Sequence, residues 1–194
     1  MEIMPKNAPD VEVQQDMPRR PTVGQRILFG IGLALFLVGF GILSFLGVRK
    51  IIRDVHRHQL METNVVVAIP ALGIKAPVLE GTEQSVLREG AGHFPGTGDV
   101  GAGNYCIAAH SSTLYKEYFN ALKDVQEGMT IELYRVDKTF VTYTVSEHFI
   151  VEPSETWILD GSGDDRVTLV TCTDDGTQRL VVVGTLDEET RALP

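Results

Sequence analysis

Residues 168–183 read TLVTCTDDGTQRLVVV, and this stretch contains the pattern that decides the fold. Two runs rich in β-branched residues, 168–172 and 179–183, flank a short loop of Thr, Asp, Gly and Gln. This pattern predicts two antiparallel strands joined by a turn. Residues that bracket the turn of a regular hairpin pair across it, with Cβ atoms about 5 Å apart. We therefore expect Cys172 and Arg179 to lie opposite each other.

Cys172 and Arg179 together suggest a nucleophile with a partner. A cation beside a thiol favours the thiolate, which is the reactive form. The guanidinium also offers donors to an oxyanion that forms when the sulfur attacks a carbonyl. The alternative is that Cys172 is a small buried hydrophobe and Arg179 a surface charge. His110, at the end of the apolar run 105–109, is the candidate base, because imidazole gives and takes protons near neutral pH.

These motifs resemble those of the sortase family. Residues 168–172 are similar to the sortase signature Thr-Leu-x-Thr-Cys, and Arg179 falls where that family has its active-site arginine. Residues 104–110 (NYCIAAH) resemble the strand that carries the sortase histidine. The resemblance covers about residues 64–186 and keeps the motifs in the family's order. Two further stretches resemble parts of the sortase barrel, residues 69–74 (IPALGI) and 90–97 (GAGHFPGT).

The resemblance implies a cysteine transpeptidase. Cys172 would attack the carbonyl of a sorting signal similar to Leu-Pro-x-Thr-Gly (LPXTG), and Arg179 would stabilise the oxyanion. His110 would protonate the leaving amine and deprotonate the incoming one, and Thr171 would help to line the substrate groove. The partners implied are LPXTG-like sorting-signal proteins and an amine nucleophile of peptidoglycan or of another surface protein.

The subclass is open on the sequence. Ala109 stands where many sortases have Gly, and Ser111 where several subclasses have Arg. An Asp-Pro-aromatic lid motif before the barrel and a second apolar span after residue 186 are both missing from the sequence, which favours an anchoring sortase over a pilus polymerase. Two other functions are compatible with the same residues. One is a membrane-tethered binding module without turnover, and the other is a cysteine hydrolase of envelope peptides.

The fold expected from residue 64 onward is all-β. Residues 65–69, 74–79, 130–134 and 140–145 form short β-rich runs with Pro and Gly between them, which is typical of a small closed or nearly closed β domain. The resemblance implies a sortase-like closed β-barrel of about eight strands with short helices. One helical turn is expected at residues 85–88. A short amphipathic helix is expected at 115–125, with Phe119, Leu122 and Val125 on one face. His93 is placed in a glycine-rich loop at 90–103, where the family has a histidine that is not the base.

Residues 27–48 (ILFGIGLALFLVGFGILSFLGV) are uncharged and long enough to cross a hydrocarbon core of about 30 Å as one transmembrane helix. A cleaved signal peptide is the alternative, although no small-residue cleavage site follows. Basic residues stand on both sides, so charge does not decide the orientation. The resemblance implies a cell-membrane protein with its catalytic domain on the extracytoplasmic face. We expect a disordered cytoplasmic tail at 1–26, a juxtamembrane linker at 49–63 and the catalytic domain at 64–194.

Composition limits the remaining possibilities. The net charge of −9 argues against nucleic acid as a partner, since phosphate binding needs a basic surface. A disulfide between Cys106 and Cys172 is the structural rival for a catalytic Cys172. If His110 lies beside Cys172, however, Cys106 is about 13 Å further along its strand, beyond the reach of a disulfide. We expect no cofactor. Calcium stays open because of the acidic loop with Asp160, Asp164 and Asp165, whose spacing is not that of an EF-hand.

Overall fold

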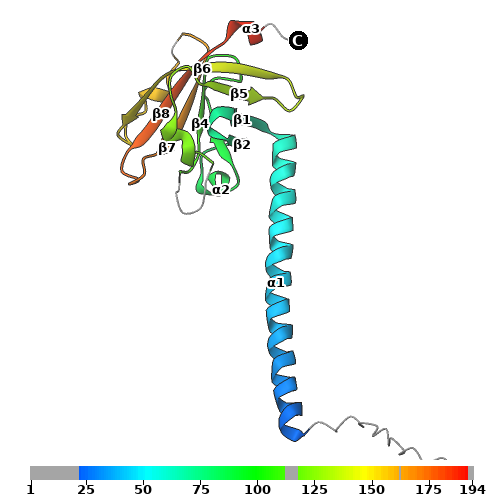
Figure 1. Ribbon diagram of the computed structural model, residues 1–194. Helices are drawn as coiled ribbons and strands as arrows, with labels where there is room; N and C mark the ends of the chain where they lie inside the picture. The colour runs from blue at the N-terminus through cyan, green and yellow to red at the C-terminus, as the bar shows by residue number, and fades with distance from the viewer. Residues whose placement is uncertain (1–21, 112–117, 162, 192–194) are drawn as a thin grey trace, which may run out of the picture. The chain divides into compact units, whose positions relative to one another are not determined.

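The computed structural model describes residues 22–111, 118–161 and 163–191. Its strands form a closed barrel in the order β1-β2-β3-β4-β7-β8-β6-β5 (Figure 1), which confirms the predicted all-β barrel of about eight strands. The strands are β1 (Val65–Ile69), β2 (Ile74–Glu80), β3 (Ala91–His93), β4 (Asn104–Ala108), β5 (Thr130–Tyr134), β6 (Phe140–Val151), β7 (Arg166–Cys172) and β8 (Arg179–Leu186).

The two faces of each strand alternate, as side chains in a pleated strand must. In β7, Val167 and Leu169 belong to the apolar core inside the barrel, while Thr168 and Val170 point to the other face. Every residue between the ends of β7 is nevertheless buried, because the chain between β6 and β7 covers part of the outer face. A strand buried on both faces reads as a continuous apolar run.

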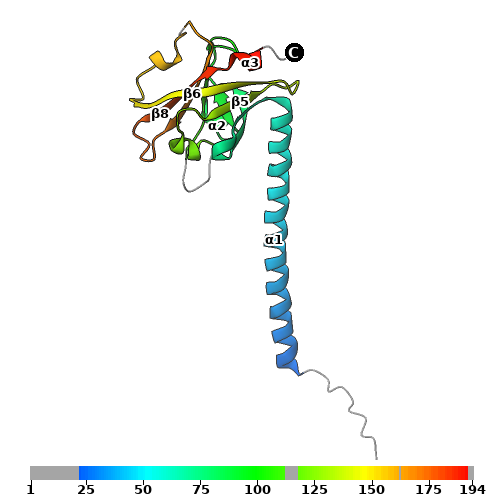
Figure 2. The same cartoon turned by 45° about the horizontal axis from the view of Figure 1, so that its top comes forward.

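Three pairings place the candidate site. β7 and β8 form the predicted antiparallel hairpin, with Cys172 opposite Arg179. β4 lies on the other side of β7 and is parallel to it, from Asn104 opposite Arg166 to Ala108 opposite Val170. β6 runs antiparallel along β8, and Figure 2 shows these two strands side by side. One sheet face therefore continues across β4, β7, β8 and β6.

The apolar N-terminal segment belongs to α1 (Val23–Thr63), a single helix of 41 residues. It begins before the predicted span and continues through the predicted linker without a break. α1 is the helix of the described chain that is long and apolar enough to cross a membrane. The chain divides into two compact units after Lys50, so residues 51–63 of α1 belong to the same unit as the barrel.

Three local predictions are wrong in detail. His93 is not in a loop but ends β3, because it pairs with Ile107 of β4. The strand expected at 140–145 is longer, because β6 passes an irregularity between Val145 and Glu147 and continues to Val151. Within the described part of the helix expected at 115–125, the chain forms the 3₁₀ helix η2 (Asn120–Asp124) instead of an α-helix.

The apolar face predicted for that segment is confirmed, since Phe119, Leu122 and Val125 are all buried. Residues 112–117 of the segment lie outside the described residues. The remaining short elements are η1 (Pro70–Leu72), α2 (Gln84–Leu87), η3 (Trp157–Leu159) and α3 (Glu188–Arg191).

Candidate active site

The β7–β8 hairpin holds Cys172 and Arg179 at its open end. They are the last cross-strand pair before the loop, which is closed by a bond from the Thr173 backbone N–H to the Gln178 carbonyl (3.1 Å). Gly176 adopts φ +72° inside the loop, a conformation that glycine reaches at little steric cost. The loop is therefore short and internally bonded, and the register of Cys172 and Arg179 follows from it.

Asp175 organises the same loop through its carboxylate. It accepts hydrogen bonds from the hydroxyls of Thr173 (2.6 Å) and Thr177 (2.8 Å) and from the Thr177 backbone N–H (3.1 Å). These donors, the Thr173 hydroxyl first, lower the pKa of Asp175 below its usual value. The Asx-turn chemistry of this residue explains why the sequence reads as a turn here.

His110 follows β4 and comes to the same end of the sheet. Ala108 is the last residue of β4 in register with β7, where it pairs with Val170. Continuing this parallel register by two residues on both strands places His110 beside Cys172. The His110 carbonyl accepts from the Phe119 backbone N–H at 3.1 Å, which fixes the chain beyond the strand. No hydrogen bond joins the His110 and Cys172 side chains among the described residues.

Thr171 ties the two strand ends together. Its side chain is buried, and its hydroxyl donates to the Ala109 carbonyl at 2.8 Å. The Ala109 backbone N–H in turn donates to the Val170 carbonyl at 3.1 Å. The residue before Cys172 thus bonds to the residue before His110. This contact gives Thr171 a positioning role that the sequence did not predict.

The three candidate catalytic residues share one face of the sheet. Side chains two residues apart on a strand point to the same face, so Cys172 shares the face of Val170 on β7, and Arg179 shares that of Val181 on β8. The core residues Leu169 and Val182 point to the opposite face. The next strand adds Val151 of β6, which pairs with Arg179. Alternation from the core residue Ala109 puts His110 on that same outer face.

The side chains of Cys172 and Arg179 are both partly exposed and therefore accessible to a substrate. The Cys172 thiol is half-buried. Arg179 is also half-buried, and its Nη1 donates to the Gln178 carbonyl at 3.0 Å. Among the described residues, no carboxylate forms an ion pair with Arg179. Most of its donors are therefore available to a bound oxygen atom.

A hollow of about 520 Å³ adjoins Cys172 at the end of the barrel. An ion pair between Lys123 of η2 and Asp174 of the hairpin loop (3.1 Å) crosses its rim. Local sequence patterns do not predict this pair, because the two residues are far apart along the chain. The lining residues are Ser111, Lys123, His148, Phe149, Ile150, Thr171, Cys172, Thr173, Asp174 and Leu180.

A second hollow of about 330 Å³ lies along the outer face and shares Phe149 with the first. Trp157 of η3 stacks on Phe149, with ring centroids 5.7 Å apart and planes within 7°. Trp157 is still 54% exposed. The two aromatic rings thus form an accessible apolar surface between β6 and the chain that precedes β7.

The two cysteines are both free, so the alternative of a disulfide between them is wrong. Cys106 pairs with Thr168, four residues before Cys172 on β7. Its side chain is fully buried, and burial raises the pKa of the Cys106 thiol to about 11. The two thiols therefore differ in exposure, and we expect Cys106 to be the less reactive one.

Both ring nitrogens of His93 have hydrogen-bond partners. Nδ1 lies 2.8 Å from a Glu80 carboxylate oxygen, and Nε2 lies 3.0 Å from the Thr97 hydroxyl. The ring also stacks on Tyr105, with centroids 4.3 Å apart. His93 is buried in the barrel wall, which fits a structural role for this histidine.

Two aspartates of the acidic loop before β7 bond to other residues of the chain. Asp164 forms an ion pair with Arg166 at 2.6 Å, and Asp165 accepts from the Gly103 backbone N–H at 2.8 Å. Among the described residues, no three His, Cys, Asp or Glu side chains gather in a group that could hold a metal ion.

Comparison with known proteins identifies a family. The Sortase domain model matches residues 67–187. Sortase A of Listeria monocytogenes is 30% identical over 124 residues, which is 63% of this chain and 55% of that protein. The chain spans about half the length of the curated relatives it matches.

Solved structures agree with this match. A sortase D5 transpeptidase of Clostridium perfringens superposes with a TM-score of 0.59 and 30% identity, covering 64% of this chain and 79% of that one. A pilus-related sortase C of Group B Streptococcus also gives a TM-score of 0.59, with 32% identity over 66% of this chain and 68% of that one.

Proposed function

Because the chain belongs to the sortase family, we propose that it is a cysteine transpeptidase of the cell envelope. It cleaves an LPXTG-like sorting signal and transfers the new carboxyl end to an amine. The observation that carries this proposal is the register of Cys172 opposite Arg179, with β4, which His110 follows by two residues, as the neighbouring strand of β7. The same three positions match the family's motifs in the sequence.

In the proposed first step, the Cys172 thiolate attacks the carbonyl carbon of the scissile peptide bond. The oxyanion that forms accepts hydrogen bonds from the Arg179 guanidinium. The protonated His110 ring then gives its proton to the departing amine as the carbon–nitrogen bond breaks. The product of this step is a thioester between Cys172 and the substrate.

In the second step, an incoming amine attacks the thioester and gives a proton to His110. Arg179 again stabilises the oxyanion, and the Cys172 sulfur leaves as the thiolate that began the cycle. The new bond is an amide, so a peptide bond is exchanged for another and no oxidant or cofactor is consumed. Thr171 supports both steps by holding the end of β4 through the Ala109 carbonyl.

The proposed path of the sorting signal is the outer face of β4, β7 and β8. The apolar surface of Trp157 and Phe149 offers contact to the proline and leucine of such a peptide. The hollow lined by Cys172 is a candidate path for the amine. Its acceptor is proposed to be peptidoglycan or another surface protein.

The proposed location is the cell membrane, with α1 as a single span and the barrel on the extracytoplasmic side. The support is the apolar part of α1, which passes the length and composition requirement for a membrane span. An anchoring role is favoured over pilus assembly because the sequence before β1 has no Asp-Pro-aromatic lid motif. The curated relatives are named sortase A, while the solved structures include the A, C and D types.

The experiment that tests the function compares products. The purified full chain is incubated with a library of LPXTG-like peptides, with and without triglycine, and the products are identified by mass spectrometry. Transfer to triglycine that disappears in Cys172→Ala is the expected result. Cleavage by water alone would make the chain a hydrolase, and no cleavage of any peptide would favour a binding module.

A further inference from the structure

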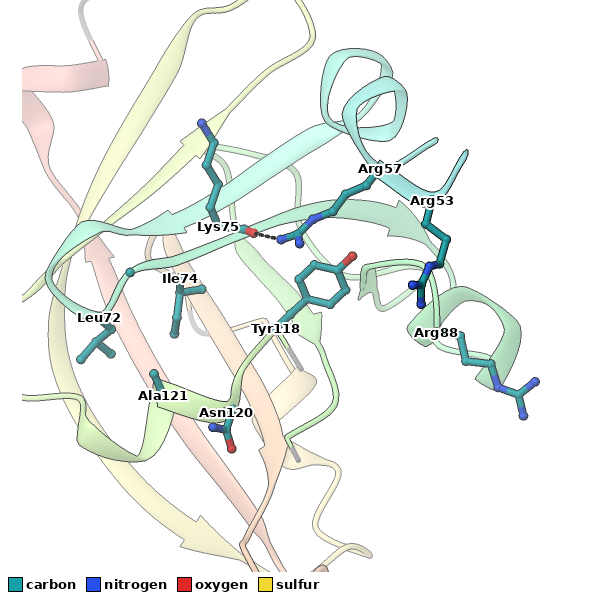
Figure 3. A pocket seen from close by; sticks show the side chains of 10 residues that line it. Arg53, Arg57, Leu72, Ile74, Lys75, Arg88, Tyr118, Asn120 and Ala121 are labelled. Atoms are coloured by element: carbon teal, nitrogen blue, oxygen red, sulfur yellow. Dashed lines mark hydrogen bonds between the residues drawn. The ribbon is translucent and has the colours of Figure 1, made fainter. Parts of the chain in front are cut away.

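A separate hollow of about 780 Å³ lies in the unit that contains the barrel (Figure 3). It is bounded by α1, by the end of η1 and the start of β2, by Arg88 after α2, and by Tyr118 and the start of η2. It shares no residue with the hollow beside Cys172. The residues that line it are Arg53, Arg57, Leu72, Gly73, Ile74, Lys75, Arg88, Tyr118, Asn120 and Ala121.

The lining of this hollow carries positive charge only. Arg53 and Arg57 come from α1, Lys75 from β2 and Arg88 from the end of α2, and no described acidic side chain lines the same space. A neighbouring hollow shares Arg53, Arg57, Arg88 and Tyr118 with this one and is also lined by Asp54 and Glu89. A carboxylate oxygen of Glu89 lies 3.1 Å from Nε2 of His56.

Arg57 is held in place by two contacts. Its Nη2 donates to the Lys75 carbonyl at 3.4 Å, and its guanidinium lies 5.1 Å from the centroid of the Tyr118 ring. The Tyr118 hydroxyl donates to the Glu89 carbonyl at 2.9 Å and so fixes the ring. Figure 3 shows this arrangement, with the Lys75 ammonium pointing away from the arginines. Arg57 is thus a preorganised cation and Lys75 contributes its backbone.

Arg53 and Arg88 complete the group from two different elements. Neither side chain has a hydrogen bond or ion pair to any other residue that the structure describes. In Figure 3 both stand on the side of the hollow away from Lys75, with Arg53 on α1 and Arg88 on the facing helical turn. Guanidinium groups bind phosphate oxygens through paired N–H donors, more specifically than ammonium groups do.

The position of Arg53 along α1 indicates which phosphate is in reach. Arg53 follows Val48, the last residue of the uncharged run, by five positions in the same helix. Five residues of α-helix rise about 7.5 Å, and the polar layer on each side of a bilayer is about 5–7 Å thick. If α1 spans the membrane, Arg53 stands at the level of the lipid headgroups, where long basic side chains reach anionic lipid.

We propose that the basic hollow formed by Arg53, Arg57 and Arg88 binds the phosphate headgroup of an anionic glycerophospholipid. Bound lipid would hold residues 51–63 and the barrel at the membrane surface. This inference rests on the membrane span of the proposed function. It is independent of the chemistry of Cys172.

The test is native mass spectrometry of the detergent-solubilised full chain titrated with dioctanoyl phosphatidylglycerol. Dioctanoyl phosphatidylcholine is the zwitterionic comparison, and glycerol phosphate is the soluble headgroup. The variants are Arg53→Gln and Arg88→Gln. The matched control is Lys138→Gln, which removes one positive charge from the turn between β5 and β6.

We expect a one-to-one adduct with phosphatidylglycerol that is stronger than that with phosphatidylcholine. Each arginine variant should weaken it about fivefold, the usual effect of one basic residue near anionic lipid, while Lys138→Gln leaves it unchanged. Equal adducts in all variants, or equal binding of the two lipids, would overturn the proposal. Glycerol phosphate that binds as tightly as the lipid would assign the hollow to a free phosphate instead.

The Cys172→Ala variant separates this proposal from the proposed function. It should bind phosphatidylglycerol like the unaltered chain while losing all peptide transfer. A chain that transfers peptides but shows no arginine-dependent lipid adduct disproves the lipid site alone. A chain with the lipid adduct and no transfer disproves the transpeptidase alone.

Discussion

Cys172 and Arg179 are direct cross-strand partners at the end of the β7–β8 hairpin, with the six residues 173–178 between them. This pairing places a cation next to a thiol on the same face of the sheet. Val151 of β6 is the next residue in the row beyond Arg179. The backbone of Arg179 is therefore held by a paired strand on each side, and its guanidinium bonds to the Gln178 carbonyl.

The first prediction concerns Arg179 as the donor to the oxyanion. Arg179→Lys keeps the charge but loses the planar set of donors, so kcat/KM should fall about 10²–10³-fold. Steady-state kinetics with a peptide and triglycine measure this. Arg135→Lys, at the turn after β5, is the matched control and should stay within about twofold. Arg179→Lys with the activity of the unaltered chain would disprove the oxyanion role.

The second prediction concerns the different reactivity of the two thiols. Iodoacetamide at pH 8 should label Cys172 and leave Cys106 unmodified, because Cys106 is fully buried and burial raises its pKa to about 11. Peptide mapping by mass spectrometry identifies the labelled residue. Labelling of Cys106 in the folded chain at a comparable rate would contradict this account.

Burial of Cys106 also predicts how stability changes at alkaline pH. Its pKa in the folded chain is above the unfolded value, so its contribution is complete below the unfolded pKa and is lost as pH rises through about 11. Cys106→Ala should cost about 1 kcal/mol of unfolding free energy at pH 7 through the lost packing. That difference should shrink between about pH 9 and pH 11, as measured by urea denaturation.

The third prediction concerns Thr171 as a positioning residue. Thr171→Val leaves the buried Ala109 carbonyl without its donor, which should cost about 1–2 kcal/mol of unfolding free energy. It should also lower kcat several-fold with little change in KM, because the chain that leads from β4 to His110 loses its hydrogen bond to Thr171. Thr171→Ser keeps the hydroxyl and should restore kcat. If valine and serine give the same kcat, the hydrogen bond has no part in the reaction.

The fourth prediction uses Trp157, the only tryptophan of the chain. If the sorting signal lies on the aromatic surface of Trp157 and Phe149, adding peptide to Cys172→Ala should shift the tryptophan emission. Trp157→Ala should raise KM for the peptide and leave kcat nearly unchanged, whereas Trp157→Phe should keep most of the affinity. An unchanged KM in Trp157→Ala would place the peptide elsewhere.

The fifth prediction concerns Asp175 and acid. Hydrogen bonds from Thr173 and then Thr177 lower the pKa of Asp175 in the folded chain. Its contribution is therefore present above the unfolded pKa of about 3.9 and is lost as pH falls through the lower folded value. At neutral pH, amides 173–178 should exchange faster in Asp175→Asn than in the unaltered chain. This difference should fade in acid, while Asp124→Asn, at an exposed site, should behave like the unaltered chain at every pH.

The sequence predicted the elements whose signals are local. The β7–β8 hairpin was predicted because β-branched runs flank turn residues, and this short-range pattern fixes which residues face each other across the turn. The strand runs alone indicate a closed or nearly closed β domain, and the eight-stranded sortase-like barrel follows from the resemblance to the family. The burial of Phe119, Leu122 and Val125 followed from their spacing.

Features that depend on partners distant in the chain were not predictable from local pattern. The hydrogen bond from Thr171 to Ala109 requires the parallel β4–β7 pairing, and no residue in either strand specifies that neighbour. The pair of Lys123 and Asp174 beside Cys172 likewise depends on the closed barrel. His93 was misplaced because glycines around it indicate a loop, whereas its pairing with Ile107 makes it part of β3.

The central claim is that Cys172 forms a thioester with the sorting signal, and intact-mass measurement of the full chain tests it most directly. The chain is mixed with an LPXTG-like peptide without added amine, quenched in acid and weighed. We predict a mass increase equal to the acyl part of the peptide, absent in Cys172→Ala and removed when triglycine is added before quenching. Cleaved peptide with no adduct at any time, or an adduct that persists in Cys172→Ala, would contradict the account.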